Sequence, residues 1–273
     1  MNVRTQIHPG RAARNFATQS YAVYKGLFYW LTVQGYIANV LVRPIVGLIL
    51  FTVLARVVFA GPMAQYLALG AATSSMIFIL LGGISQSFVY ERTQGTILFL
   101  FSSPANRFVN YLSRPVLHYP NAILTFIFGM FGAWLIVGMD FSLVNWVGFS
   151  VAVLVTAGAI TAFCQCMGVM AIVVREWSQS LDLVSSILSV LTGTIIPLTV
   201  YPPIIQEIAR FLPITNGLEA MRATFTGAVF SDVAMLVVRE AVNGLGFVIV
   251  GYIGFVVFER VAKRQGTLDL ESF

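Results

Sequence analysis

The stretch LVNWVGFSVAVLVTAGAITAFCQCMGVMAIV, residues 143–173, decides the fold, because it contains no Asp, Glu, Lys or Arg. A helix of about 20 mostly apolar residues crosses the roughly 30 Å hydrocarbon core of a bilayer. The rest of the chain resembles this stretch: 58% of the 273 residues are hydrophobic and 10% are charged, whereas about 25% are charged in soluble domains. The sequence therefore predicts an integral membrane protein.

Five further apolar runs are long enough to span a bilayer, and residues 143–173 are long enough to tilt or protrude. The sequence therefore predicts an all-α fold of six transmembrane helices. No segment between the runs reaches the roughly 50 residues that a domain usually needs, so residues 1–273 are expected to form one membrane domain. The expected spans are about 36–58, 64–89, 116–138, 143–173, 180–200 and 233–258.

Residues 11–31, which precede the first span, have the pattern of an amphipathic helix, with apolar and basic residues on opposite faces. Such a pattern is typical of a helix that lies in the membrane interface. A helix packed on a cytoplasmic partner is the alternative. The residues expected to define this interfacial helix are Arg11, Arg14, Phe16, Lys25 and Trp30.

The basic residues predict the orientation. When both termini are placed inside, most Lys and Arg fall in cytoplasmic stretches, as the positive-inside rule requires. We therefore expect a multi-pass protein of the plasma (inner) membrane with both termini cytoplasmic. The same rule accounts for the net charge of +5, so nucleic acid is not an expected partner. Cys164 and Cys166 would point to different helix faces and have no metal-ligand spacing around them, so no disulfide or metal site is expected.

ATP hydrolysis is not expected of this chain. Its only lysines, Lys25 and Lys263, do not follow a phosphate-cradling G-x-x-x-x-G-K-[ST] loop. The chain is therefore predicted to be no enzyme and to hold no cofactor, so that any ATP and Mg²⁺ would belong to a separate subunit. The spans are also expected to hold no Asp or Glu well inside them. That disfavours an ion-coupled carrier, although backbone carbonyls at broken helices can also bind ions.

Polar residues on two spans are candidates for a substrate path or gate. Arg43 lies in the first span and precedes Pro44, which should kink that helix. It either meets an anionic headgroup or phosphate, or its long stem snorkels to the interface. On the fifth span, Asp182, Ser185 and Ser189 recur as a stripe. This stripe could face the substrate path or the partner subunit. The alternative is that its small residues allow close packing of helices.

The segment between the fifth and sixth runs is too polar and too often interrupted by proline to span. It is expected to form an extracellular re-entrant or interfacial pair of half-helices, whose backbone must be covered by protein or wetted by a cavity. Glu219 and Arg222 lie three residues apart there and could pair on one helix face. They would act either as an exposed ion pair, worth roughly 0–1 kcal/mol, or as a gate.

A charged loop follows the second span. It reads Glu91-Arg92-Thr93-Gln94-Gly95-Thr96-Ile97-Leu98 and continues to Ser103-Pro104. Charge at the membrane exit, a short amphipathic helix and a proline stop predict a small knob on the surface.

The order of these features resembles that of the membrane subunits of type-2 ABC exporters, the ABC-2 permease family, over essentially the whole chain. An amphipathic N-terminal helix precedes six spans, and the loop after the second span has the pattern E-R-x-x-G-T-[IL]. Arg43 departs from this family, whose members more often carry an uncharged residue there. The other motifs that carry the resemblance are Pro197-Leu198 with Pro202, residues 208–213 and residues 218–222.

The resemblance implies how such a chain would work. The loop after the second span would be a coupling helix that docks on a separate ABC ATPase subunit, the N-terminal helix would touch the same subunit, and residues 202–226 would lie near the exit. Two permeases, identical or related, and two ATPases would export an amphipathic, drug-like, lipid-linked or glycan cargo. An ion-coupled carrier and a non-transporting membrane scaffold are the alternatives. The implied coupling residues are Glu91, Arg92, Gly95, Thr96 and Pro104.

Overall fold

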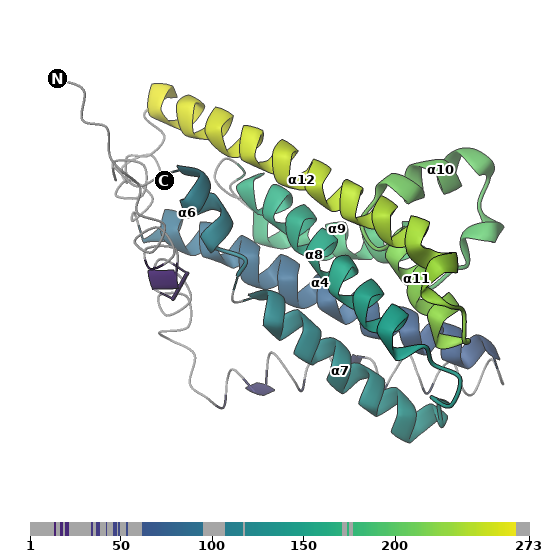
Figure 1. Ribbon diagram of the computed structural model, residues 1–273. Helices are drawn as coiled ribbons and strands as arrows, with labels where there is room; N and C mark the ends of the chain where they lie inside the picture. The colour runs from purple at the N-terminus through teal and green to yellow at the C-terminus, as the bar shows by residue number, and fades with distance from the viewer. Residues whose placement is uncertain are drawn as a thin grey trace.

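A computed structural model describes residues 62–94, 107–116, 118–170 and 177–265, together with Val174 and isolated positions between 14 and 53. All the regular elements among these residues are helices, and no β-strand occurs in them. The long helices lie side by side and run the length of the molecule (Figure 1). The expected all-α fold is confirmed for this part of the chain.

Four helical stretches are long and apolar enough to cross a membrane, and each overlaps an expected span. The stretch that contains α7 already begins at Tyr111, within the short helix α6 (Arg107–Ser113). The first, third and fourth of these stretches run in the same direction through the bundle, and the second runs in the opposite direction (Figure 1). The long helices are α4 (Pro62–Thr93), α7 (His118–Val137), α8 (Trp146–Val169) and α12 (Phe230–Gln265).

Two expected spans are not among these four. The first, 36–58, lies almost wholly outside the described residues. The expected helix over 180–200 is wrong at its C-terminal end, because α9 (Trp177–Leu191) has 15 residues and is only about 22 Å long. Gly193 follows with a φ of +80°, a conformation that glycine adopts readily after a helix. The chain turns there and then forms a 3₁₀ turn, η3 (Leu198–Val200).

Two short helices follow, α10 (Pro203–Phe211) and α11 (Thr215–Phe225). Proline suits the first position of α10, where its missing N–H would have no helical partner. Leu212 is extended, as a residue before proline usually is. Ile214 then adopts a φ of +93°, which is rare for a β-branched residue, and the chain reverses into α11.

Asn145 begins α8 and ties it to α11. Its side-chain oxygen accepts a hydrogen bond from the N–H of Gly148 at 3.2 Å, which is how an N-cap residue satisfies a free N–H at a helix start. The N–H of Asn145 donates to the carbonyl of Thr224 at 3.0 Å. Its amide donates to the carbonyl of Ala228 at 3.2 Å. One residue thus joins the start of α8 to the end of α11 and to the turn before α12.

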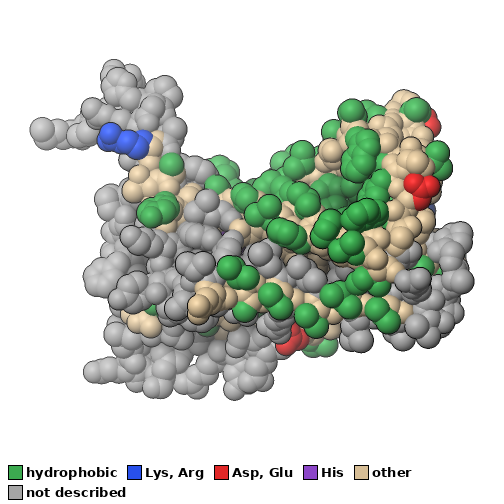
Figure 2. All heavy atoms as spheres, turned by 90° about the horizontal axis from the view of Figure 1, so that it is seen from below, with side chains coloured by type: hydrophobic (Ala, Val, Ile, Leu, Met, Phe, Trp, Pro, Cys, Tyr) green, Lys and Arg blue, Asp and Glu red, His purple; other side chains and the backbone are tan. Residues whose placement is uncertain are grey.

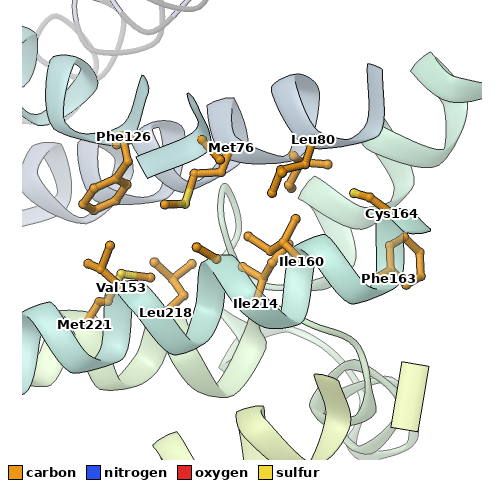
Figure 3. Close-up of a cluster of buried hydrophobic side chains, with 14 of the residues drawn as sticks. Met76, Leu80, Phe126, Val153, Ile160, Phe163, Cys164, Ile214, Leu218 and Met221 are labelled. Carbon is orange, nitrogen blue, oxygen red and sulfur yellow. The ribbon is translucent and has the colours of Figure 1, made fainter. Parts of the chain in front are cut away.

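The core lies between α4, α7, α8 and α11 (Figure 3). Met76 and Leu80 of α4 face Val153 and Ile160 of α8, and Leu218 of α11 lies beside them; all five side chains are buried (Figure 3). Lipid tails are as apolar as these side chains, so dispersion contacts in a close-packed interior stabilise the bundle more than removal from solvent does.

Glycines bring α8 and α12 close together. A Cβ added at Gly244 would lie 3.0 Å from the Cα of Ala159, and one added at Gly251 would lie 3.0 Å from the Cα of Cys166. Small residues at such contacts let two helix backbones approach. The outer surface is different: among the described residues, hydrophobic side chains far exceed charged ones on the face shown in Figure 2. Helix α12 exposes Val242 and Leu245 by 60% and 64%.

Candidate functional site

Polar side chains gather at the two ends of the bundle. We call the end formed by α6, the last turn of α4 and the C-terminal part of α12 the α6 end. The end formed by α10, α11 and the starts of α4 and α8 is the α11 end (Figure 1). Because polar groups buried in a membrane protein are costly, their clusters are candidate functional sites.

An ion pair closes the base of the loop at the α6 end. A guanidinium nitrogen of Arg114, Nη2, lies 2.5 Å from Oε2 of Glu91. The Arg114 side chain is fully buried, while the Glu91 side chain is 19% exposed. The guanidinium also lies over the ring of Phe88, 4.2 Å from its centroid, so a cation–π contact adds to the charge pairing.

This ion pair joins two elements that are distant in sequence. Glu91 lies in the last turn of α4, and Arg114 directly follows α6, just before α7. The segment between them therefore starts and ends at one charged contact. Because an unpaired charge is expensive to bury, the pair resists separation of α4 from the α6–α7 junction.

Helix α6 is also fastened to α8 and α12. The side-chain amide of Gln165, on α8, donates to the backbone carbonyl of Tyr111 at 2.8 Å. The buried ring of Tyr111 packs against Phe255 and Tyr252 of α12, with centroid separations of 5.6 and 5.9 Å. Aromatic contacts in this range are favourable. A displacement of α6 would therefore also displace α4, α8 and α12, or break these contacts.

At the α11 end, one residue of α12 supports the start of α11. The N–H of Ile214 donates to Oε1 of Glu240 at 2.5 Å, and the N–H of Gly217 donates to Oε2 at 3.1 Å. Glu240 has no exposed surface. The first N–H groups of a helix have no helical acceptor, and a helix N-terminus carries partial positive charge. The carboxyl group satisfies both needs.

Another residue of α12, Asn243, supports the end of α10. Its amide nitrogen donates to the backbone carbonyl of Arg210 at 2.7 Å. The amide of Asn216 donates to the same carbonyl at 2.8 Å. The last carbonyls of a helix have no helical donor, so these two amides satisfy the C-terminal end of α10.

The side chain of Arg222 connects α11 to α4 and to the turn after α9. The guanidinium of Arg222 donates to the carbonyls of Gly193 at 2.9 Å, Tyr66 at 3.2 Å and Thr194 at 3.4 Å. It also lies 3.3 Å from the centroid of the Tyr66 ring. Burial lowers the pKa of Arg222 to about 10, which leaves the side chain cationic at neutral pH.

Comparison with known proteins gives the family. A family model described as ABC-2 type transporter matches residues 21–226. This chain belongs to the ABC-2 type transporter family. It is therefore a multi-pass membrane protein and the permease part of a transporter. The matched residues include α6, the Glu91–Arg114 contact and all of α11, and they stop before α12. No curated protein matches the chain.

In this ABC-2 chain the expected coupling residues are only partly described. Glu91 and Arg92 were expected in a loop, but both belong to the last turn of α4, because the helix continues to Thr93. Gly95, Thr96 and Pro104 lie outside the described residues. The partner of Glu91, Arg114, was not among the expected site residues. Its place directly before Pro115 and the third apolar run is the signal that could have singled it out.

The expected path residues on α9 share one face of the helix but differ in burial. Ser185 and Ser189 are buried, with exposures of 1% and 6%, and α9 packs on α4. Asp182 is exposed, although it lies on the same side of α9 as Ser189, about two turns away. Burial therefore favours close helix packing for the two serines, whereas the exposed carboxylate of Asp182 takes no part in that packing.

The expected pair of Glu219 and Arg222 is also corrected. Glu219 is exposed, whereas the guanidinium of Arg222 turns inward to the three carbonyls and the Tyr66 ring. Of the expected interfacial residues, Arg14 is helical and exposed. Arg43 and the remaining interfacial residues, Arg11, Phe16, Lys25 and Trp30, lie outside the described residues.

The expectation that no acid lies well inside a span is wrong. Glu240 lies within the expected run 233–258 and within the long helix α12, and it is fully buried. Glu259, near the other end of α12, is 2% exposed. Glu240 stands out in the sequence as an acid inside an apolar run. What the sequence lacked was its partner, since hydrogen bonding to the start of α11 depends on the tertiary fold.

Proposed function

We propose that this chain is the permease subunit of an ATP-driven exporter that moves an amphipathic, drug-like, lipid-linked or glycan cargo out of the cytoplasm or inner leaflet. The observation that carries the proposal is the Glu91–Arg114 contact at the base of the 92–113 segment in a chain of the ABC-2 family. ATP and Mg²⁺ would bind to a separate ABC ATPase, and this chain would contribute no catalytic residue.

The contact suggests how force enters the permease. An ATPase that closes on nucleotide must push on something rigid, and packed elements transmit such a push as rigid-body motion. A segment held at both ends by one ion pair cannot be pushed without moving α4 and the α6–α7 junction together. Tyr111 and Gln165 extend the linkage to α8 and α12. Residues 92–113, with Gly95, Thr96 and Pro104, would form the docking surface.

The protein would lie in the plasma membrane, with the α6 end and both termini on the cytoplasmic side. The distribution of Lys and Arg supports this orientation. The α11 end would then face outward, with α10 and α11 as a re-entrant segment near the exit. Gly217, near the start of α11, contacts Thr156 of α8. Thr156 lies about 15 Å along the helix axis from Trp146, the first residue of α8, so the start of α11 would lie well below the outer end of the bundle. A second permease copy or a related chain would complete a 2+2 assembly.

A buried carboxyl within a span is also what an ion-coupled carrier uses, and Glu240 is such a group. Both of its oxygens, however, accept N–H bonds from the start of α11. A carboxyl engaged in this way supports the backbone rather than awaiting an ion. This arrangement favours the exporter over the carrier.

Crosslinking in native membranes tests the proposal. Gln94 is exposed at the end of α4, so a Gln94→Cys variant carrying a short bifunctional reagent is expected to capture a subunit with a G-x-x-x-x-G-K-[ST] loop. Ser231 is exposed at the other end of the molecule, and Ser231→Cys is the matched control that should not capture this subunit. Capture of no nucleotide-binding subunit from position 94 would contradict the proposal.

A further inference from the structure

The two ends of the α10–α11 segment are held by one face of α12. Glu240 and Asn243 lie three residues apart, so they project from the same side of the helix. The acid accepts the N–H groups at the start of α11, and the amide donates to the carbonyl at the end of α10. The acceptor thus meets the N-terminal end of α11, where N–H groups lack helical acceptors. The donor meets the C-terminal end of α10, where carbonyls lack helical donors.

Packing fastens the same segment to α8. A Cβ on Gly217 would overlap the Thr156 hydroxyl group, so only glycine permits this approach of α11 to α8. At the other end of α11, Asn145 binds the carbonyls of Thr224 and Ala228. Helix α11 therefore packs along both α8 and α12, whereas it touches α4 only lightly.

The contact with α4 and the turn after α9 is of a different kind. Beside the apolar packing of Leu218 in the shared core, it depends on the flexible side chain of Arg222. The guanidinium lies over the Tyr66 ring, and its hydrogen-bond acceptors are neutral carbonyls. Release of Arg222 leaves no α11 backbone group unpaired, and both the guanidinium and the carbonyls of the Gly193 turn could bind water instead. Release of Glu240 would strand two backbone N–H groups and a carboxyl inside the bundle, which is far more costly.

We propose that Glu240 and Asn243 are positioning residues that make the α10–α11 segment one body with α12 and α8, so that the α11 end opens at the Arg222 contact. This inference rests on the proposed ATP-driven function. It identifies the moving boundary: α11 stays on α12 while the gap opens toward Tyr66, Gly193 and Thr194. Two buried threonines report on the two sides, because Thr215 lies at the Glu240 contact and Thr194 at the Arg222 contact, with exposures of 1% and 0%.

The test measures how fast a hydrophilic maleimide labels Thr215→Cys and Thr194→Cys. The complex with its co-purifying subunits is held in lipid nanodiscs, and Cys164 and Cys166 are replaced by alanine. With ATP and Mg²⁺ added, we expect labelling at position 194 to rise about tenfold while labelling at position 215 stays unchanged. A parallel rise at both positions would overturn the proposal, because α11 would then be leaving α12.

A substitution tests the positioning role without nucleotide. Glu240→Gln keeps the shape but turns an acceptor into a donor facing a backbone N–H, so labelling at position 215 should rise about tenfold. Glu207→Gln makes the same chemical change at an exposed side chain of α10 and should leave that labelling unchanged. Equal labelling in the two variants would overturn the proposal.

Two further results keep the test decisive. If Glu240→Gln fails to insert into the membrane, Asn243→Asp replaces it as the test variant, because it sets an acceptor against the Arg210 carbonyl at a half-buried position. Asn243→Asp should raise labelling at position 215. No rise would overturn the proposal. If ATP changes labelling at neither position while Glu240→Gln still exposes position 215, the positioning role stands and the ATP-driven function fails.

Discussion

Arg114 is the residue on which the α6 end depends most. Its buried guanidinium is paired with Glu91 and stacked on Phe88. Arg114→Ala removes both contacts and leaves a partly buried carboxylate without this partner. We expect a loss of about 2 kcal/mol in the free energy of unfolding, measured by denaturant titration of the purified chain in detergent.

Arg210 provides the control for this prediction. It pairs with Glu207 at 2.8 Å, but its side chain is 46% exposed, so Arg210→Ala should change the stability by less than about 0.5 kcal/mol. Arg114→Lys keeps the charge but loses the planar contact with Phe88, and should fall between the two. If Arg114→Ala were no more destabilising than Arg210→Ala, the Glu91–Arg114 contact could not be a structural brace.

Asn145 makes two separable contributions at the start of α8. Asn145→Ala loses the N-cap and the amide donor to Ala228, and should cost about 1–2 kcal/mol. Asn145→Asp retains an acceptor for the Gly148 N–H and places negative charge at a helix N-terminus, so it should cost less than Asn145→Ala. Thermal unfolding of the two variants in one detergent checks the order. Both variants lose the amide donor, so the reverse order would mean that repulsion between the new carboxylate and the Ala228 carbonyl outweighs the cap.

For single residues, the sequence predicted which charged side chains are notable better than it predicted the groups that they contact. It identified Arg222 and Glu91 as notable charges, but it assigned Arg222 to Glu219 from helical spacing alone. The acceptors of Arg222, on α4 and the turn after α9, are distant in sequence. Spacing within one helix cannot reveal such contacts. The position of Glu240 inside an apolar run was visible in the sequence, but its two donors were not, since they lie at the start of another helix.

Among the elements, the approach of α12 to α8 gives a test that compares two glycines of one helix. A Cβ at Gly244 would lie 3.0 Å from a backbone atom of Ala159, whereas one at Gly246 meets nothing within 4 Å. Gly244→Ala should therefore destabilise the bundle by about 1–3 kcal/mol. Gly246→Ala should be neutral or stabilising, because alanine favours the helix.

Unfolding of both glycine variants in the same detergent measures this difference. Equal stabilities would show that α8 and α12 have room to separate, and would contradict the close contact. The comparison is a strict one because the two positions share a helix and undergo the same chemical change.

The sequence predicted long helices well and interruptions less well. Four apolar runs lie where membrane-length helices occur, because apolar length is a strong signal. The end of α9 was missed, since apolar residues continue past Gly193 and hydropathy does not register a residue with positive φ. The break between α10 and α11 was expected from its prolines, but the reversal at Ile214 was not. That reversal depends on acceptors supplied by α12.

For the whole molecule, the family resemblance and the membrane class are confirmed by the match to the ABC-2 type transporter model. Composition alone predicted the membrane class, because so few charged residues cannot cover a soluble surface. The order of short motifs, rather than any single motif, carried the family. The cargo and the partner subunits stay predictions, since they depend on surfaces that this chain forms with other molecules.

Gentle purification of the tagged chain from its native membrane, with every co-purifying subunit identified and quantified by mass spectrometry, tests whether the chain works with a separate ATPase. We expect a nucleotide-binding subunit with a G-x-x-x-x-G-K-[ST] loop, in equal amount to the permease chains. Recovery of the chain without any nucleotide-binding subunit, in several mild detergents, would rule out the ATP-driven exporter and favour an ion-coupled carrier.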